Sequence, residues 1–187
     1  RITQARIAPL HYFTVTEWRK EKSKILRVVR EKFGSSALIV RSSCSLEDKL
    51  AHSNAGKFLS ILNVKFNNIE EAVDKVIESY SVARPEDEVL IQPMIENVIR
   101  SGVAFSHDPN SGSPYRVINY VDGSDTTVVT SGTGGELVYI ADGSPRRQSE
   151  EFSSILDLLD ELLEVFKQVP IDIEFAYTNA PNRNSLW

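Results

Sequence analysis

The sequence has little of the chemistry that depends on cysteine and histidine. Cys44 is the only cysteine among 187 residues, and the three histidines, His11, His52 and His107, are scattered. One cysteine excludes an internal disulfide and the spacings of structural zinc sites, and it is typical of a cytoplasmic protein. The scattered histidines disfavour a histidine-based triad and a cysteine nucleophile. We interpret Cys44 as a small packing residue.

Long apolar runs and a broad cationic surface are also missing. No stretch approaches the ~20 apolar residues of a membrane span. The formal net charge is −5, but residues 1–49 carry a net +6 and residues 50–187 a net −11. This balance disfavours membrane and nucleic-acid partners. The basic first part is either a solvated helix surface or a local site for a small anion such as a phosphate.

Apolar residues at helical spacing predict three helices: 17–33 with Thr16 as N-cap and Gly34 at its end, Asn68 to Tyr80, and Ser149 to Gln168. Alternating or short apolar runs between turn residues predict strands. These runs are 37–41, 57–64, 88–95, 101–106, 115–120, 126–131, 136–141 and 171–177. The order predicts an α+β protein with two lobes, about 1–87 and 88–187. The only methionine is Met94 and the chain starts at Arg1, so we expect a piece of a longer polypeptide.

The last predicted strand, "IDIEFAY", places two carboxylates together. Asp172 and Glu174 alternate with the apolar residues, so they share one face of the strand. Their Cα atoms are expected ~7 Å apart, where the charges repel unless a cation or water separates them. Magnesium is commonly held by one or two carboxylates together with substrate phosphates. The pair is therefore either a metal–nucleotide site or an exposed face without a ligand.

A second set of polar residues follows the strand "ALIV". Arg41 ends this strand, and its planar guanidinium can bind two phosphate oxygens at once. Ser42 and Ser43 add hydroxyl donors, and the small residues of "SNAG" (53–56) let backbone amides approach an anion. Alternatively, the serines only satisfy the loop's own backbone. The stretch "FSHDPNSG" is likewise either a site loop or ordinary turn chemistry.

Taken together, four motifs resemble a family. "IVRSSCSLED…SNAG", "VLIQPMI…SGVAFSHDPNSG", "VTSG" (129–132) and "PIDIEFAY" resemble, in the same order, motifs of the N-terminal nucleotide-binding domain of phosphoenolpyruvate synthase and pyruvate phosphate dikinase. The resemblance extends over residues 38–177. It implies an ATP-grasp-like fold of two lobes, with mixed or antiparallel sheets and flanking helices, that binds ATP and Mg²⁺.

The resemblance also implies residue roles. Arg41 would bind the ATP phosphates as the catalytic arginine, and Asp172 and Glu174 would hold magnesium. Gln92 and Met94 would lie near the adenine, on the strand that links the lobes. The remaining contacts to ATP would come from Ser42, Ser43, Glu47, Asp48, Ser53, Ala55 and Gly56.

In this family the domain passes a phosphoryl group from ATP to a histidine on a separate domain, which then phosphorylates pyruvate in a barrel domain. Both of those partner domains are absent from these 187 residues, so we expect the isolated fragment to be inactive. The family's Gly-Gly-Lys-Gly stretch has no counterpart before Arg41, and Arg84 stands in a shortened connection that carries a functional arginine in the family. An alternative is therefore a degenerate, non-catalytic regulatory or interaction module of a larger protein.

Overall fold

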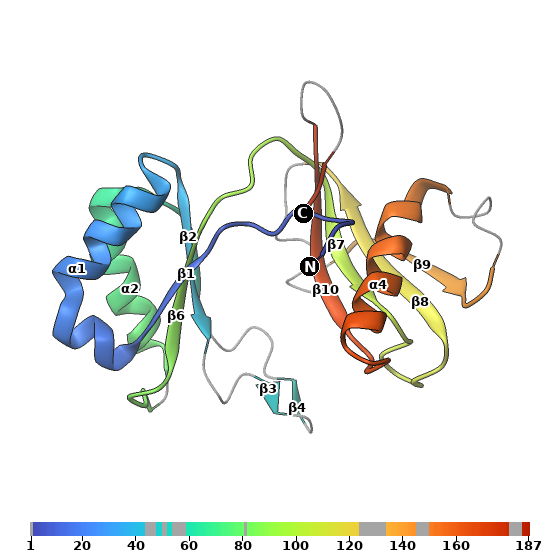
Figure 1. Ribbon diagram of the computed structural model, residues 1–187, viewed down its shortest axis with the longest axis horizontal. Coiled ribbons are helices and arrows are strands. Elements are labelled where there is room, and N and C mark those ends of the chain that lie inside the picture. Colours follow the sequence, from blue (N-terminus) through green and yellow to red (C-terminus); the bar gives the residue numbers. More distant parts are fainter. Residues whose placement is uncertain are drawn as a thin grey trace. The chain divides into compact units, whose positions relative to one another are not determined.

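The computed structural model describes residues 2–43, 48–49, 52–53, 59–80, 82–123, 134–144, 150–179 and 185–187 (Figure 1). The chain divides into two compact units. One unit is continuous, from Ala8 to Met94, and we call it the N unit. The other combines Arg1–Ile7 with Ile95–Trp187, and we call it the C unit. Each unit has a hydrophobic core of its own.

The N unit packs two helices on one face of a four-stranded sheet (Figure 1). The strand order is β1-β6-β2-β5, and each neighbouring pair is antiparallel. A separate pair of two-residue strands, β3 and β4, lies between β2 and β5 in the chain. The elements are β1 (His11–Thr14), α1 (Val15–Phe33), β2 (Leu38–Ser43), β3 (Asp48–Lys49), β4 (His52–Ser53), β5 (Ser60–Val64), a 3-10 turn (Phe66–Asn68), α2 (Ile69–Glu78) and β6 (Glu88–Pro93).

The C unit has a five-stranded antiparallel sheet in the order β11-β10-β7-β8-β9, with helix α4 packed on one face (Figure 1). The elements are β7 (Val98–Phe105), β8 (Tyr115–Asp122), β9 (Glu136–Ala141), α4 (Ser153–Val165), β10 (Asp172–Thr178) and β11 (Ser185–Leu186). The predicted α+β class is confirmed, and every strand pair within the described residues is antiparallel. The predicted strand 126–131 and the predicted cap Ser149 lie outside the described residues.

Helix α1 packs on the sheet of the N unit because its apolar residues lie on one face of the helix. Its buried side chains recur at helical spacing and meet the sheet; they are Val15, Trp18, Ile25, Val29 and Phe33. Gly34 follows the last turn with φ 61°, a left-handed value that glycine adopts without steric cost. The predicted N-cap, Thr16, is wrong. Thr14 caps the helix, because its hydroxyl accepts from the Glu17 N–H while the Glu17 carboxylate accepts from the Thr14 N–H.

The first residues of the chain are part of the C unit. Ile2 and Ala5 pack against its core, and the backbone N–H groups of Thr3 and Gln4 donate to the Glu161 carboxylate of α4 at 2.8 and 3.0 Å. The Arg6 N–H donates to the Leu186 carbonyl at 2.9 Å. The chain then enters the N unit, and it returns to the C unit after Met94.

Candidate functional site

The sheet of the N unit has one face that its helices do not cover, and Arg41 lies on it. Leu38 and Val40 are fully buried and point toward the helices, so Arg41, one residue on, points the other way. Arg41 pairs with Leu90 of β6, and Ile39 pairs with Gln92. Because paired residues share a face, Gln92 lies on the same open face as a diagonal neighbour of Arg41.

The two serines that follow Arg41 lie on opposite faces. Ser43 shares the open face with Arg41. Ser42 lies on the helix side and is only 7% exposed. The sheet therefore separates the Ser42 hydroxyl from the Arg41 side chain, whereas Ser43 lies on the same side as the arginine.

Met94 and the loop of small residues complete the predicted set in the N unit. Met94 is half-buried directly after β6, and its N–H donates to the Ala37 carbonyl at 2.8 Å. Asp48 and Ser53 are backbone partners across β3 and β4. The other predicted residues of this segment lie outside the described residues, namely Cys44, Glu47, Ala55 and Gly56.

Arg84 is exposed and belongs to a turn that leads into β6. Its N–H donates to the carboxylate of the buried Asp87 at 2.8 Å, and the Asp87 carbonyl accepts from the N–H of Val15 at the start of α1. This turn joins α1 to β6, so the backbone around Arg84 has a structural role.

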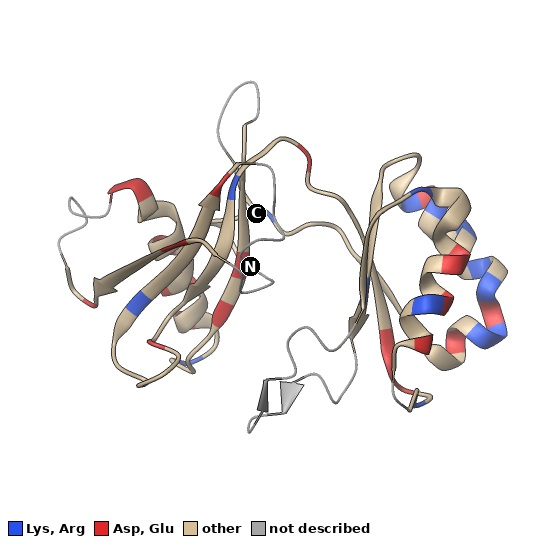
Figure 2. Ribbon diagram, turned by 180° about the vertical axis from the view of Figure 1, so that it is seen from behind, with Lys and Arg blue, Asp and Glu red and all other residues tan. Residues whose placement is uncertain are grey.

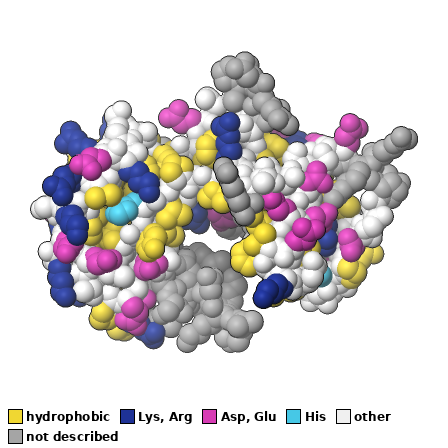
Figure 3. Space-filling model, in the orientation of Figure 1, with side chains coloured by type: hydrophobic (Ala, Val, Ile, Leu, Met, Phe, Trp, Pro, Cys, Tyr) yellow, Lys and Arg dark blue, Asp and Glu magenta, His cyan; other side chains and the backbone are white. Residues whose placement is uncertain are grey.

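Most basic residues of the first third belong to helix α1 and are interspersed with acidic ones (Figure 2), and basic and acidic side chains lie together on the surface of the N unit (Figure 3). Lys22 of α1 contacts Glu70 and Asp74 of α2 at 3.0 and 3.3 Å. Within α2, Lys75 contacts Glu71 at 2.7 Å. These pairs support the interpretation of a solvated helix surface, since α1 and the open face with Arg41 are on opposite sides of the sheet.

Asp172 and Glu174 lie on β10 in the C unit, and both are exposed. Their neighbours Ile173, Phe175 and Tyr177 pack on the α4 side, with Phe175 4% exposed. The carboxylates therefore share the sheet face opposite α4. They offer only oxygen atoms on a rigid strand, a donor set that fits a hard cation such as Mg²⁺. Within the part of the chain that the structure describes, no cluster of three or more His, Cys, Asp or Glu residues forms a metal site, so further ligands would come from elsewhere.

The "FSHDPNSG" stretch forms a turn that uses its own polar groups. The Asp108 carboxylate accepts from the Asn110 N–H at 2.9 Å and from the Ser111 hydroxyl at 2.8 Å, and these bonds lower the pKa of Asp108. The Ser106 hydroxyl accepts from the Ile171 N–H at 2.8 Å, next to the start of β10. The turn thus holds the end of β7 against β10. This agrees with the interpretation of the stretch as ordinary turn chemistry.

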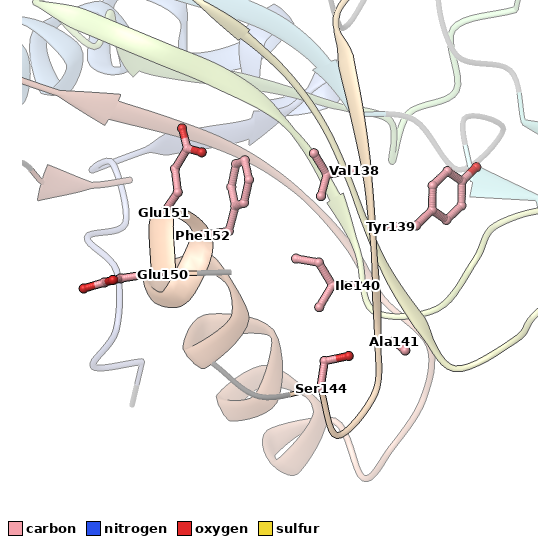
Figure 4. Close-up of a pocket in the computed structure, with 8 residues that line it drawn as sticks. All are labelled: Val138, Tyr139, Ile140, Ala141, Ser144, Glu150, Glu151 and Phe152. Atoms are coloured by element: carbon pink, nitrogen blue, oxygen red, sulfur yellow. The ribbon is translucent and has the colours of Figure 1, made fainter. Parts of the chain in front are cut away.

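A cavity of about 230 Å³ lies between β9 and the residues that precede α4 (Figure 4). Val138, Ile140 and Phe152 give it apolar walls, whereas the Tyr139 side chain lies on the other side of the strand. Glu151 at its rim is paired with Arg100 at 2.6 Å. None of the site residues predicted from the sequence lines this cavity, and we interpret it as a packing gap between helix and sheet.

Two polar side chains that the sequence analysis missed lie on the same sheet face as the carboxylates. Asn119 of β8 and Ser101 of β7 each have a side-chain oxygen that is shielded from solvent and has no hydrogen-bond partner among the described residues. Their positions in apolar strands were the available signal, since a polar residue inside such a strand needs a partner.

Residues 14–86 match the family model of the pyruvate phosphate dikinase AMP/ATP-binding domain. The resemblance is confirmed. The matched region contains Arg41 and the whole "IVRSSCSLED…SNAG" motif of the dikinase family, whereas Gln92, Asp172 and Glu174 lie after it.

Solved structures of other proteins are similar to this chain, and two of them are described here. The crystal structure of PH1788 from Pyrococcus horikoshii Ot3 is similar with a TM-score of 0.55 at 14% identity, covering 98% of this chain and 82% of that one. This similarity concerns the fold alone. D-Alanine-D-Alanine Ligase from Helicobacter pylori aligns with a TM-score of 0.38 at 16% identity, over 97% of this chain and 48% of the ligase, which is too weak to support an argument. No curated protein matches the sequence.

Proposed function

We propose that this chain is the Mg·ATP-binding domain of a phosphotransferase of the phosphoenolpyruvate synthase and pyruvate phosphate dikinase type. The observation that carries the proposal is Arg41, which lies inside the matched AMP/ATP-binding region and on the helix-free face of its sheet. A guanidinium is suited to this role because it binds phosphate oxygens in a planar fork.

The proposed roles follow the chemistry of the side chains. Arg41 and Ser43 contact the phosphates, and Gln92 and Met94 contact the adenine. Asp172 and Glu174 hold the magnesium ion that accompanies ATP, which would neutralise phosphate charge. Phosphoryl transfer depends mainly on such positioning and charge neutralisation. Exposure of both carboxylates on one strand face supports this assignment.

We further propose that the phosphoryl group passes to a histidine on a separate domain of a cytoplasmic protein, and from there to pyruvate or a related acceptor. Two of the chain's three histidines have local structural surroundings: His11 is partly buried on β1, and His107 belongs to the turn after β7. Within the described residues no helix is long and apolar enough to cross a membrane.

A thermal melt of the 187-residue chain with and without Mg·ATP tests the proposal. At one hundred times its dissociation constant, a ligand that binds only the folded state stabilises it by about 2.7 kcal/mol, which raises the melting temperature measurably. Arg41→Ala is expected to abolish this increase.

Arg27→Ala, an exposed arginine on α1, is the matched control and should keep the full increase. A wild-type melting temperature that is unchanged at millimolar Mg·ATP would contradict the proposal. That result would favour the regulatory or interaction module.

A further inference from the structure

An exposed aromatic side chain shares the open face of the N unit with Arg41 and Gln92. Phe13 of β1 is 3% exposed and stacks on Trp18 of α1, so it points toward the helices. Successive side chains of a strand point to opposite faces, and Tyr12 therefore lies on the open face, where it is 58% exposed. The two residues with proposed contacts to phosphate and adenine thus share their sheet face with a tyrosine ring.

The register of three strands places these side chains around Leu90 of β6. Tyr12 pairs with Leu90 from one side and Arg41 pairs with it from the other, so they form one row across β1, β6 and β2. Neighbouring strands lie about 4.8 Å apart, which puts the Cα atoms of Tyr12 and Arg41 about 10 Å apart. Gln92, two residues after Leu90 on the same face, is a diagonal neighbour of both, about 7–8 Å away. The aromatic, amide and guanidinium groups therefore surround the half-buried Leu90.

The chemistry of these side chains matches the parts of ATP. The ring of Tyr12 and the side chain of Leu90 offer apolar contact to a flat base, and nucleobases stack strongly on aromatic rings. A glutamine amide such as that of Gln92 can bind the N6 and N7 positions of adenine together. The Arg41 guanidinium can bind phosphate oxygens. Base and phosphates are at opposite ends of a nucleotide, as Tyr12 and Arg41 are at opposite ends of the row.

Charge decides which end of the nucleotide lies next to Tyr12. Glu88 pairs with Ser43 and lies on the same face, two residues before Leu90, so it is a diagonal neighbour of both Tyr12 and Arg41. Its carboxylate repels phosphates but not an uncharged base. The Arg41 guanidinium offsets this repulsion on the β2 side, whereas a tyrosine ring does not offset it on the β1 side. The base therefore fits the β1 side and the phosphates fit the β2 side.

We infer that Tyr12 stacks on the adenine of ATP and, together with Gln92, positions the nucleotide on the open face of the N unit. This inference rests on the proposed function and adds to it a base-binding residue on β1. The matched AMP/ATP-binding region covers residues 14–86, so neither Tyr12 nor Gln92 is part of it.

Calorimetric titration of the 187-residue chain with Mg·ATP and with Mg·tripolyphosphate tests the inference, because tripolyphosphate lacks the base. We expect Tyr12→Ala to weaken Mg·ATP binding about tenfold and to leave tripolyphosphate binding unchanged. Tyr12→Phe keeps the ring and should bind Mg·ATP like the wild type. Phe166→Ala removes a similarly exposed aromatic side chain just after α4, and this matched control should bind both ligands like the wild type.

The outcomes separate the inference from the proposed function. If the wild type does not bind Mg·ATP, the proposed function fails and the inference fails with it. If the wild type binds Mg·ATP and Tyr12→Ala binds it equally tightly, or loses affinity for both ligands alike, only the inference fails. Tyr12→Phe binding as weakly as Tyr12→Ala would also overturn the inference, because stacking requires the ring and not the hydroxyl.

Two further arrangements keep the test decisive. If tripolyphosphate binds too weakly to measure, the contrast between Tyr12→Phe and Tyr12→Ala in Mg·ATP decides the outcome. Should Tyr12→Ala not fold, Tyr12→Thr takes its place in both titrations, because threonine lacks the ring and is favoured in strands.

Discussion

Gly102 shows how one residue controls the packing of the C unit. It lies in β7, opposite Tyr120 of β8. A Cβ placed on Gly102 would be 2.9 Å from the Phe175 ring and from the Tyr120 Cα, and closer still to the Asn119 carbonyl oxygen. Only glycine lets the ring of Phe175 lie directly on the strand. A glycine inside an apolar strand pattern indicates such a close approach.

Gly102→Ala is therefore expected to lower the free energy of unfolding by about 1–3 kcal/mol, because overpacking forces the strand or the ring to shift. Urea denaturation measures this effect. Ser60→Ala, an exposed strand residue of the N unit, is the control and should change stability little. Equal stability of both variants would contradict the close approach.

At the scale of an element, the start of α1 depends on hydrogen bonds in both directions between Thr14 and Glu17, one of them from the Glu17 N–H to the Thr14 hydroxyl. The Glu17 carboxylate accepts from the Thr14 N–H at 2.7 Å and from the Thr14 hydroxyl at 3.0 Å, and these bonds lower the pKa of Glu17. A carboxyl whose folded-state pKa is lowered stabilises the fold above its unfolded pKa. That contribution is lost as the pH falls through the folded pKa.

We expect Thr14→Ala to cost about 1 kcal/mol at pH 7. Glu17→Ala should destabilise at pH 7, and its difference from the wild type should shrink once the pH falls below about 4, where the unfolded glutamate begins to protonate. Urea denaturation at several pH values measures both effects, with Glu31→Ala as a control carboxyl outside the cap. A Glu17→Ala difference that does not depend on pH would argue against the reciprocal cap.

Helices and strands with a strong local sequence pattern could be predicted. Strands that form only by pairing with residues far away in the sequence could not. The alternation in "IDIEFAY" predicts β10 and the shared face of Asp172 and Glu174, because strand geometry alone fixes that relation. The four residues of β1 form a strand only because they pair with β6, almost eighty positions later. Thr14 and Glu17 have capping-box spacing, but Thr16 is an equally suitable N-cap residue by type, so residue type alone does not locate the cap.

The candidate site follows the same division. The roles proposed for Arg41 and for the two carboxylates follow from their residue types and from their positions on predicted strands. Which of Ser42 and Ser43 shares a face with Arg41 depends on where the helices pack, and only the structure shows this. The row from Tyr12 to Arg41 depends on the register of three strands, which the sequence does not specify locally.

For the whole molecule, the two separate cores predict separate responses to core mutations. Ile91 and Leu159 are both fully buried, the first in the N unit and the second in the C unit. Truncating either to alanine is expected to cost about 2–5 kcal/mol. Hydrogen exchange should then increase mainly within the unit that carries the substitution. The two variants serve as controls for each other, and an increase throughout the chain in both would indicate one cooperative unit.

The placement of residues 1–7 in the C unit has a consequence for biosynthesis. The N unit is an uninterrupted insertion, so its sheet can be completed as soon as β6 has left the ribosome. Domains tend to fold in this order during translation. Ile2 and Ala5, by contrast, are synthesised before the N unit but have no core to join until α4 and β10 are synthesised. Residues 2–7 therefore stay without their native contacts until the whole N unit has been synthesised, and a chaperone could bind them during that interval.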